Sequence, residues 1–535
     1  MSLLKKILIT LLVLVVLLIV ANYSLSYYIS KKLPSIIHAE KDFPYNISYE
    51  ELDIRLLSGS FTMHNAYIAP KDTTASQLQQ GAFAQIERIE VQRFNLWQLL
   101  RNDRIKVKRV IIEKPEVILY PREDKYNPHE DFVKPFKNTI TTTSLEIRDG
   151  NFKMLDSLQN VTLKASNINF DLFNISVDSA SVEKDIPLRY RDYNFTCDSL
   201  LYSAGRFYNL AADKITSSDS TLTVDNFKMI PLHTRRQFNT LIHEEKDQFN
   251  ITAKRIAVPK VDWGFFRDTL YVHAPEVTLQ AVNANIYRGK MVKDDPTRKK
   301  LYSELLRSLD FDLKVDKLLL KNTSILYEEQ LEYSRPPAQV SFAKFYATVA
   351  NVYSPVHKDK LPNTTIDVQC LFLRKAPFSV HWEFNTLDTS DSFSISGHLQ
   401  NISADDIDPI TRPLMNATTK GRIKEVQFAF SGNRERAKGT FAIEYDDLKV
   451  DLYKKGGKKE NKLLSAVGNL LVKNDTKDKL KKTDVEVNRA KDKSVFNFIW
   501  KFNEEGLMKS ALPVTVARIV EKRKEKKAEK KKKDK

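Results

Sequence analysis

Several residue types in this chain can carry chemistry, but their spacing does not assemble a catalytic site. Adjacent carboxylates occur at Asp405-Asp406 and Asp446-Asp447. One pair falls at a predicted helix start and the other at a strand turn, where capping and solvation explain them without acid–base catalysis. The nine histidines are scattered, with neither a His-Glu-x-x-His helix nor the serine elbow of hydrolases. The sequence therefore predicts no enzyme.

Cofactor and metal chemistry also lack a motif. The two cysteines, Cys197 and Cys370, are too few for a zinc site or a disulfide framework, although one bridge between them stays possible. The chain of 535 residues holds 14 Gly, but 29 Phe and 21 Tyr. That balance favours strands over phosphate-binding glycine loops. We expect no cofactor and no metal.

The net charge of +17 is concentrated near the C-terminus. Residues 454–535 carry most of it and end in EKRKEKKAEKKKKDK. Such a tail can gain roughly 1 kcal/mol per basic residue beside an anionic membrane, or can simply keep the protein soluble. The rest of the chain is nearly neutral, so we expect no nucleic-acid partner.

An aromatic cluster precedes the last basic stretch. Aromatic side chains among lysines are typical of a membrane interface or a partner groove. Residues 454–535 are therefore predicted to be an amphipathic and Lys-rich tail, with membrane-interface candidates Phe496, Phe498, Trp500 and Phe502.

The N-terminus predicts a membrane anchor. Residues Ile7 to Tyr28 contain no charged side chain and are long enough to cross a hydrocarbon core of about 30 Å. We predict a cytoplasmic stub and transmembrane helix over residues 1–28, with the following domain translocated. The alternative is a cleaved signal peptide, because Ser24-Leu25-Ser26 places small residues at a plausible cleavage distance.

Residues 29–453 consist mostly of short segments that alternate apolar and polar residues, a pattern typical of half-buried strands. Asp149-Gly150-Asn151 and Ser431-Gly432-Asn433 read as hairpin turns. Short helices are expected from Asp295 and from Ser403. The predicted fold class is mainly β, with a largely antiparallel sheet and a few short helices.

Some of these strands resemble one another. Ile105 to Tyr120 aligns without gaps with Leu313 to Tyr327, and Pro115-Glu116-Val117 recurs as Pro275-Glu276-Val277. Upstream, Arg88 to Trp97 is echoed by Arg255 to Trp263. The sequence favours a repeated unit, although irregular spacing leaves open that these are ordinary amphipathic strands.

Together these segments resemble the AsmA-like family of envelope proteins. After the anchor, Leu99-Leu100 is followed by a strand, Pro115 and a second strand to Tyr120. Near the other end, the similarity rests on Asp406 to Pro409, Gly421, Gly439 and the segment Tyr445 to Lys449. The resemblance covers both ends of the β-rich part, and the middle agrees only in pattern.

The resemblance implies an elongated β-sheet curled into an apolar groove that conducts lipid, with phospholipid as the expected cargo. It implies a single-pass inner-membrane protein with its bulk in the periplasm, which serves outer-membrane biogenesis. Membrane lipids and other envelope proteins are the implied partners. A non-transporting scaffold or assembly factor for outer-membrane proteins is the alternative.

The candidate lining residues of this groove are the alternating apolar positions of the repeated strands. Each could equally be an ordinary core position, because alternation alone does not distinguish an open face from a packed one. The candidates are Ile105, Val107, Val110, Ile112, Val117, Leu119, Leu270, Val272, Val277, Leu279, Leu313, Val315, Leu318 and Leu320.

Overall fold

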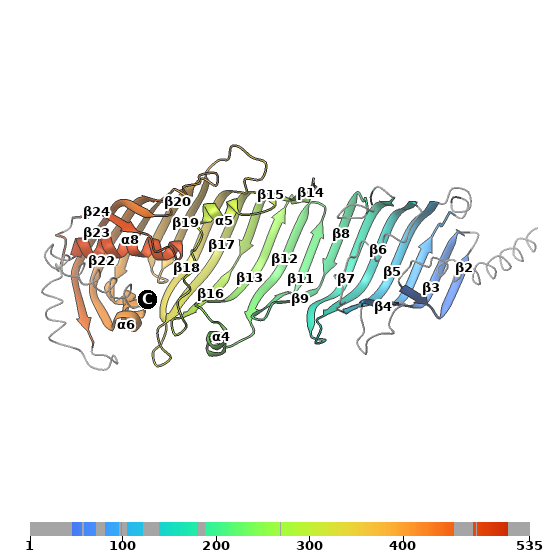
Figure 1. The fold of residues 1–535 in the computed structure, drawn as a ribbon, viewed down its shortest axis with the longest axis horizontal. Coiled ribbons are helices and arrows are strands. Elements are labelled where there is room, and N and C mark those ends of the chain that lie inside the picture. Colours follow the sequence, from blue (N-terminus) through green and yellow to red (C-terminus); the bar gives the residue numbers. More distant parts are fainter. Residues whose placement is uncertain are drawn as a thin grey trace, which may run out of the picture. The chain divides into compact units, whose positions relative to one another are not determined.

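The computed structural model describes residues 45–55, 58–70, 81–95, 98, 104–120, 139–178, 181, 188–267, 269–453, 475–477 and 479–511. These residues are mainly β, as the alternating segments predict, with few short helices (Figure 1). The chain divides into two compact units, Met1–Asp225 and Asn226–Lys535. The predicted membrane span from Ile7 to Tyr28 lies outside the described residues.

The first unit is built from strands that follow one another along the sheet. They are β1 Tyr45–Ser48, β2 Glu51–Arg55, β3 Ser60–Pro70, β4 Gly81–Gln92, β5 Arg104–Tyr120, β6 Thr139–Leu155, β7 Val161–Val177, β8 Asp192–Cys197, β9 Ser199–Ala204, β10 Tyr208–Ala212, β11 Lys214–Ser218 and the start of β12 Thr221–Pro231.

The second unit contains further strands and the described helices. Its strands are β13 Asp247–Pro259, β14 Asp262–Phe266, β15 Thr269–Gln280, β16 Asn283–Gly289, β17 Asp312–Gln330, β18 Ala338–Tyr353, β19 Thr364–Phe372, β20 Ala376–Phe384, β21 Phe393–Ser403, β22 Ala417–Gly432, β23 Arg436–Leu452 and β24 Lys481–Asn488. Its helices are α4 Arg235–Leu241, α5 Tyr302–Arg307, the 3-10 turn η3 Ala404–Ile407, α6 Asp408–Met415 and α8 Val495–Ala511.

Most strand pairs are antiparallel, as predicted, but each unit also contains parallel pairing. In the first unit β5 runs parallel to β6, and in the second β15 and β16 both run parallel to β17. Parallel neighbours need a long connection, and residues 121–138 and 290–311 supply it. The sequence prediction missed these pairs because it expected long connections to be helical.

A line of left-handed residues crosses the sheet of each unit. In the first unit Lys114 and Asp149 stand at neighbouring positions of β5 and β6, with Asn167 close by in β7. The predicted hairpin turn at Asp149-Gly150-Asn151 is therefore wrong: these residues lie within β6. A positive φ inside a strand is typical of a bulge, which bends the strand and interrupts its alternation. The predicted turn at Ser431-Gly432-Asn433 does join β22 to β23.

The second unit repeats this arrangement. Three left-handed residues correspond to Lys114, Asp149 and Asn167 of the first unit. They are Ala281, between β15 and β16, Asn322 in β17 and Lys344 in β18. The second unit's β15 and β16 thus correspond to β5, and its β17 corresponds to β6. The echo of Arg88 to Trp97 in Arg255 to Trp263 fits this correspondence, because Arg88 is in β4 and Arg255 in β13.

The ungapped alignment of Ile105 to Tyr120 with Leu313 to Tyr327 joins non-equivalent strands, β5 and β17. Two neighbouring amphipathic strands share the same alternation, so a sequence match could not tell the first parallel strand from the second.

The helices are short except α8. The helix expected from Asp295 begins later, at Tyr302, although the Asp295 carboxylate accepts hydrogen bonds from the Thr297 N–H and hydroxyl. Ser403 does precede η3 and α6, as predicted. Within the described ranges, no helix combines the length and hydropathy that a membrane span requires.

Candidate functional site

The first unit carries rows of apolar side chains across neighbouring strands. Residues paired across a ladder lie on the same face of a sheet, so the register places Val110 beside Val91 and Leu145, and Ile112 beside Ile89 and Ile147. Val117 lies between Ala84 and Phe152, and Leu119 between Ala82 and Met154. Ile105 pairs with Ile140, and Val107 with Thr142.

The rows through Ile112 and Val117 continue on one face across the line of left-handed residues. A Cβ at Gly150 would lie 3.2 Å from Pro115 Cγ and 3.3 Å from Ile147 Cγ2. Side chains before and after the bulge therefore meet on one side of the sheet.

The alternate positions of the same strands carry a charged network. Arg88 Nε donates to Glu113 at 2.7 Å, and Arg109 Nε donates to Glu146 at 2.6 Å. Arg148 bridges Glu146 at 2.7 Å and Asp171 at 2.6 Å. The hydrogen bond from Arg109 lowers the pKa of Glu146, so this carboxylate stays ionised. From Arg109 to Glu113 of β5, the two charged residues and Ile111 thus alternate with the apolar row residues Val110 and Ile112.

The candidates of the second unit lie next to one another. Across the parallel ladder of β15 and β17, the pairs are Val272 with Leu313, Val277 with Leu318, and Leu279 with Leu320. Val315 pairs with Ala274, and Leu270 pairs with Phe265 of β14. The residues selected from the sequence are thus cross-strand neighbours in the structure. The sequence alone could not show that they lie side by side.

The apolar face also continues past the bulge at Asn322. Leu279 and Ile325 both pack against a small cluster formed by Ala253, Val282 and Ala284. Leu279 pairs with Leu320, before the bulge, whereas Ile325 follows it.

Burial of the fourteen candidates is incomplete. Val107 and Val315 are buried, at 8% and 9% exposure. The other twelve are half-buried. An aliphatic side chain in a closed core would be nearly inaccessible, so these residues keep part of their apolar surface available for contact.

Two rows extend from these candidates across the second unit. Each step joins two residues that pair across neighbouring strands. Row A is Val277, Leu318, Val349, Ile366, Trp382, Ile395 and Phe430; row B is Leu279, Leu320, Ala347, Val368, Val380, Gly397 and Phe428.

Both rows end in a closed aromatic core beneath α8. Trp382, Ile395 and Phe430 of row A are 6%, 4% and 4% exposed. The Phe502 ring of α8 stacks on Phe430 with a centroid distance of 4.2 Å. A Cβ at Gly506 would lie 2.3 Å from the Phe441 ring, so a glycine is needed for this close approach. Helix α8 lies over β23 and β24 (Figure 1).

The four membrane-interface candidates divide between two sides of α8. Phe498 and Phe502 are 1% and 0% exposed and belong to the core, so they cannot contact a membrane surface. Phe496 and Trp500 are 61% and 48% exposed. Residues 481–511 therefore extend the folded domain beyond Tyr453 with a strand and a helix. A packed helix could have been predicted from the sequence, because apolar and small residues recur at helical spacing on one side. They are Val495, Phe498, Phe502, Gly506 and Ser510.

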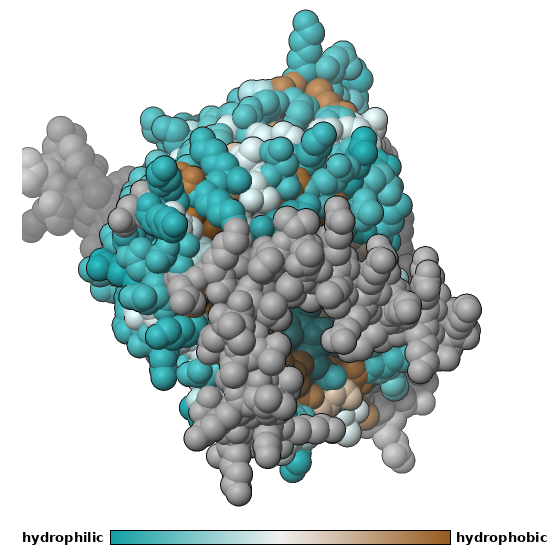
Figure 2. All heavy atoms as spheres, turned by 90° about the vertical axis from the view of Figure 1, so that its left-hand side faces the viewer, coloured by the Kyte–Doolittle hydropathy of each residue, from teal (hydrophilic) through white to brown (hydrophobic). Residues whose placement is uncertain are grey.

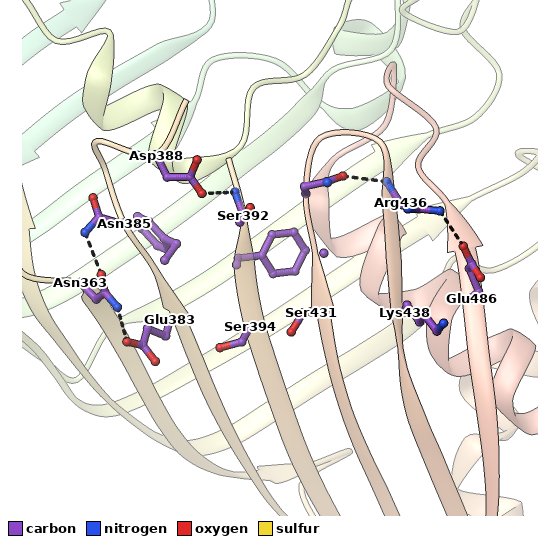
Figure 3. A pocket seen from close by; sticks show the side chains of 14 residues that line it. Asn363, Glu383, Asn385, Asp388, Ser392, Ser394, Ser431, Arg436, Lys438 and Glu486 are labelled. Carbon is purple, nitrogen blue, oxygen red and sulfur yellow. Dashed lines mark hydrogen bonds and ion pairs between the residues drawn. The ribbon is translucent and has the colours of Figure 1, made fainter. Parts of the chain in front are cut away.

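The same end of the second unit has a mainly hydrophilic outer surface, with hydrophobic residues in small areas and in a recess (Figure 2). A shallow polar cavity of about 630 Å³ lies at the turns of β20–β23. Its side chains bind one another: Asn363 donates to Glu383 at 2.5 Å, and Arg436 pairs with Glu486 at 3.3 Å (Figure 3). This pairing assembles no nucleophile with a base.

Other reactive groups are also buried or dispersed. Cys197 and Cys370 are both buried free thiols, so the possible bridge is absent. Burial raises the pKa of the Cys370 thiol to about 12, which disfavours the reactive thiolate. Among the described residues, no cluster of His, Cys, Asp and Glu is suited to hold a metal ion.

No family model matches the chain, and no curated protein is detectably similar to it.

Proposed function

We propose that this chain is a membrane-anchored protein that binds phospholipid along its apolar rows and conducts it within the bacterial envelope. The observation that carries the proposal is the continuity of half-buried aliphatic residues from strand to strand, exemplified by Val277, Leu318 and Val349. If the sheet curls around this face, the rows form the lining of a groove.

The physical reason is the cost of exposing acyl chains to water. Each methylene removed from water contributes about 0.8 kcal/mol, so a chain of a dozen or more methylenes crosses an aqueous gap only with an apolar partner. Because the apolar contacts repeat from strand to strand with similar binding free energy, the lipid can move along the rows without being trapped at one site. The charged face of the first unit would point to water.

The location within the cell rests on the sequence. The uncharged segment from Ile7 to Tyr28 supports a single-pass inner-membrane anchor, and the resemblance to the AsmA-like family supports a periplasmic domain that serves outer-membrane biogenesis. In this proposal the protein is not an enzyme, and its partners are membrane lipids and other envelope proteins.

A non-transporting envelope scaffold is the second candidate. The closed core beneath α8 favours it, because there the same rows are filled by protein side chains. The two functions differ in whether lipid occupies the half-buried part.

Native mass spectrometry of the full chain purified from its membrane tests the proposal, with organic extraction to identify the bound lipid. We expect several lipids per chain, and their loss in Val110→Asp and Leu318→Asp variants that remain folded. The matched controls are Lys106→Asp and Lys317→Asp, exposed positions on the same strands, which should keep the lipid. A folded, lipid-free wild-type protein would favour the scaffold.

A further inference from the structure

An arginine-rich cluster lies within the second unit, where α5, the turn before β21, the β22–β23 hairpin and the end of β24 meet. The arginine cluster consists of Arg298, Arg307, Arg434 and Arg489. Arg489 is 7% exposed. Burial of its guanidinium group needs a matching anion, because an unpaired charge removed from water is strongly disfavoured.

The cluster's central carboxylates are engaged by three of the arginines. Asp391, 1% exposed, accepts hydrogen bonds from Arg307 Nη2 at 2.6 Å and Ser303 Oγ at 2.8 Å. Its other oxygen lies 3.2 Å from Arg434 Nη2.

Glu304 is fully used by Arg298, which donates through both terminal nitrogens at 2.8 and 2.6 Å. Asp391 and Glu304 thus serve three guanidinium groups, and neither bonds the fourth. The nearby Glu435 carboxylate accepts a hydrogen bond from Lys491 at 2.7 Å.

Arg489 has neutral partners only. Its Nη2 donates to the Lys299 carbonyl at 2.5 Å, whereas its Nε and Nη1 are buried and bond no described group. Arg434 Nε is buried in the same way. Burial, together with the nearby Arg298 charge, lowers the pKa of Arg489. The cluster therefore has an excess of positive charge and three unused donors, against one carboxylate oxygen, Asp391 Oδ2, that accepts no hydrogen bond from a described group.

We propose that the arginine cluster binds a phosphate-type oxyanion, either free phosphate or the phosphate of a lipid headgroup. Guanidinium groups present planar pairs of N–H donors that match the oxygens of phosphate. A bound oxyanion would both accept the unused N–H groups of Arg489 and Arg434 and balance the excess charge.

The lipid form of this ligand rests on the proposed function. Helix α5 supplies Ser303 and Arg307 to the cluster, and its exposed Tyr302 contacts Phe496 of α8 at a ring distance of 6.5 Å. Tyr302, Phe496 and Trp500 are 36%, 61% and 48% exposed. A headgroup at the cluster would thus have an aromatic surface nearby for its acyl chains.

Thermal unfolding of the full chain with increasing inorganic phosphate, at ionic strength matched with chloride, tests the site. Phosphate should raise the melting temperature of the wild-type protein, since a ligand that binds the folded state stabilises it. Arg489→Gln should weaken phosphate binding about tenfold or more, because it removes charge-assisted hydrogen bonds. Arg436→Gln, in the same hairpin but paired with Glu486, should respond like wild type.

Arg489→Gln is expected to fold, because it removes a buried unpaired charge. No phosphate effect on the wild-type protein, or an equal effect on Arg489→Gln, would overturn the proposal and leave buried water as the partner of Arg489.

Calorimetric titration with glycerol 3-phosphate and with dihexanoyl phosphatidic acid distinguishes the two sources. Binding of the lipid about tenfold tighter than its soluble headgroup, with the gain lost in Trp500→Asp, supports a lipid headgroup. Equal affinities support free phosphate. Either result is independent of the lipid retained at Val110 and Leu318, so failure of the proposed function and failure of this site are separately visible.

Discussion

Rows A and B are half-buried over most of β15–β19 and mostly buried over β20–β22. The backbone pairing is the same kind in both regions, and both regions present apolar side chains. What differs is the cover: α8 packs its phenylalanines onto the second region, and aromatic residues replace Val and Leu there. A sheet face becomes a closed core only where another element covers it, so one face can combine a stable end with an available surface.

Removing the helix contact should have the largest effect on stability. Phe502→Ala is expected to lower the free energy of unfolding by about 3–5 kcal/mol, because it opens a cavity against Phe430. Urea unfolding of the full chain measures this loss. The control Phe496→Ala, at an exposed position of the same helix, should change stability by less than about 1 kcal/mol. Similar losses in both variants would contradict the assignment of the two sides of α8.

Matched truncations within row A should sharpen the comparison. Ile395→Ala, at a residue 4% exposed, is expected to lower stability by about 2–5 kcal/mol. Leu318→Ala should lower it by about half as much, because part of that side chain is already in contact with water. Equal losses would show that the face near β17 is as closed as the core, and would weaken the proposed lipid site.

At the bulge positions, the effect of a substitution on stability should depend on the backbone preference of the new residue more than on the size of its side chain. Asn322 has φ 53°, a conformation that Gly adopts freely and that Asn tolerates better than Ala. Asn322→Ala should therefore lower the free energy of unfolding by about 1 kcal/mol, whereas Asn322→Gly should be close to wild type. Thermal unfolding of both variants checks the order, and a more stable Ala variant would contradict it.

The charged face of the first unit should contribute least, with a defined pH dependence. The pKa of Glu146 is lowered in the folded state by its hydrogen bond from Arg109. The resulting stabilisation is complete above the pKa of unfolded glutamate, about 4.3, and is lost as the pH falls through the lower folded pKa. Because Arg109 is 43% exposed, solvent screening limits the effect to below about 1 kcal/mol.

The measurement compares urea midpoints of wild type and Glu146→Gln at about pH 7 and about pH 3. The wild-type protein should lose more stability on acidification than the variant. An identical loss would show that this pair has no net role.

The sequence predicted what depends on alternation and missed what depends on strand neighbours. Val277 and Leu318 could be assigned to the apolar face of their strands from the sequence. The alternation of apolar and polar residues, however, contains no information on which strand lies beside them. The parallel pairing of β5 with β6 was missed because the connection between them was expected to need a helix. In α8, Phe496 and Phe498 project from different sides of the helix, and only the position of Phe393 and Phe430 determines which side is buried.

The last described strand has a further consequence for aggregation. Within the described residues β24 pairs with β23 alone, so its second edge offers backbone groups to which another chain could add a strand. Lys482, Asp484 and Glu486 are exposed along it, and charges of both signs on an edge disfavour such addition. In the part of the chain that the structure describes, the sheet thus ends in a strand whose charges oppose extension into a fibril.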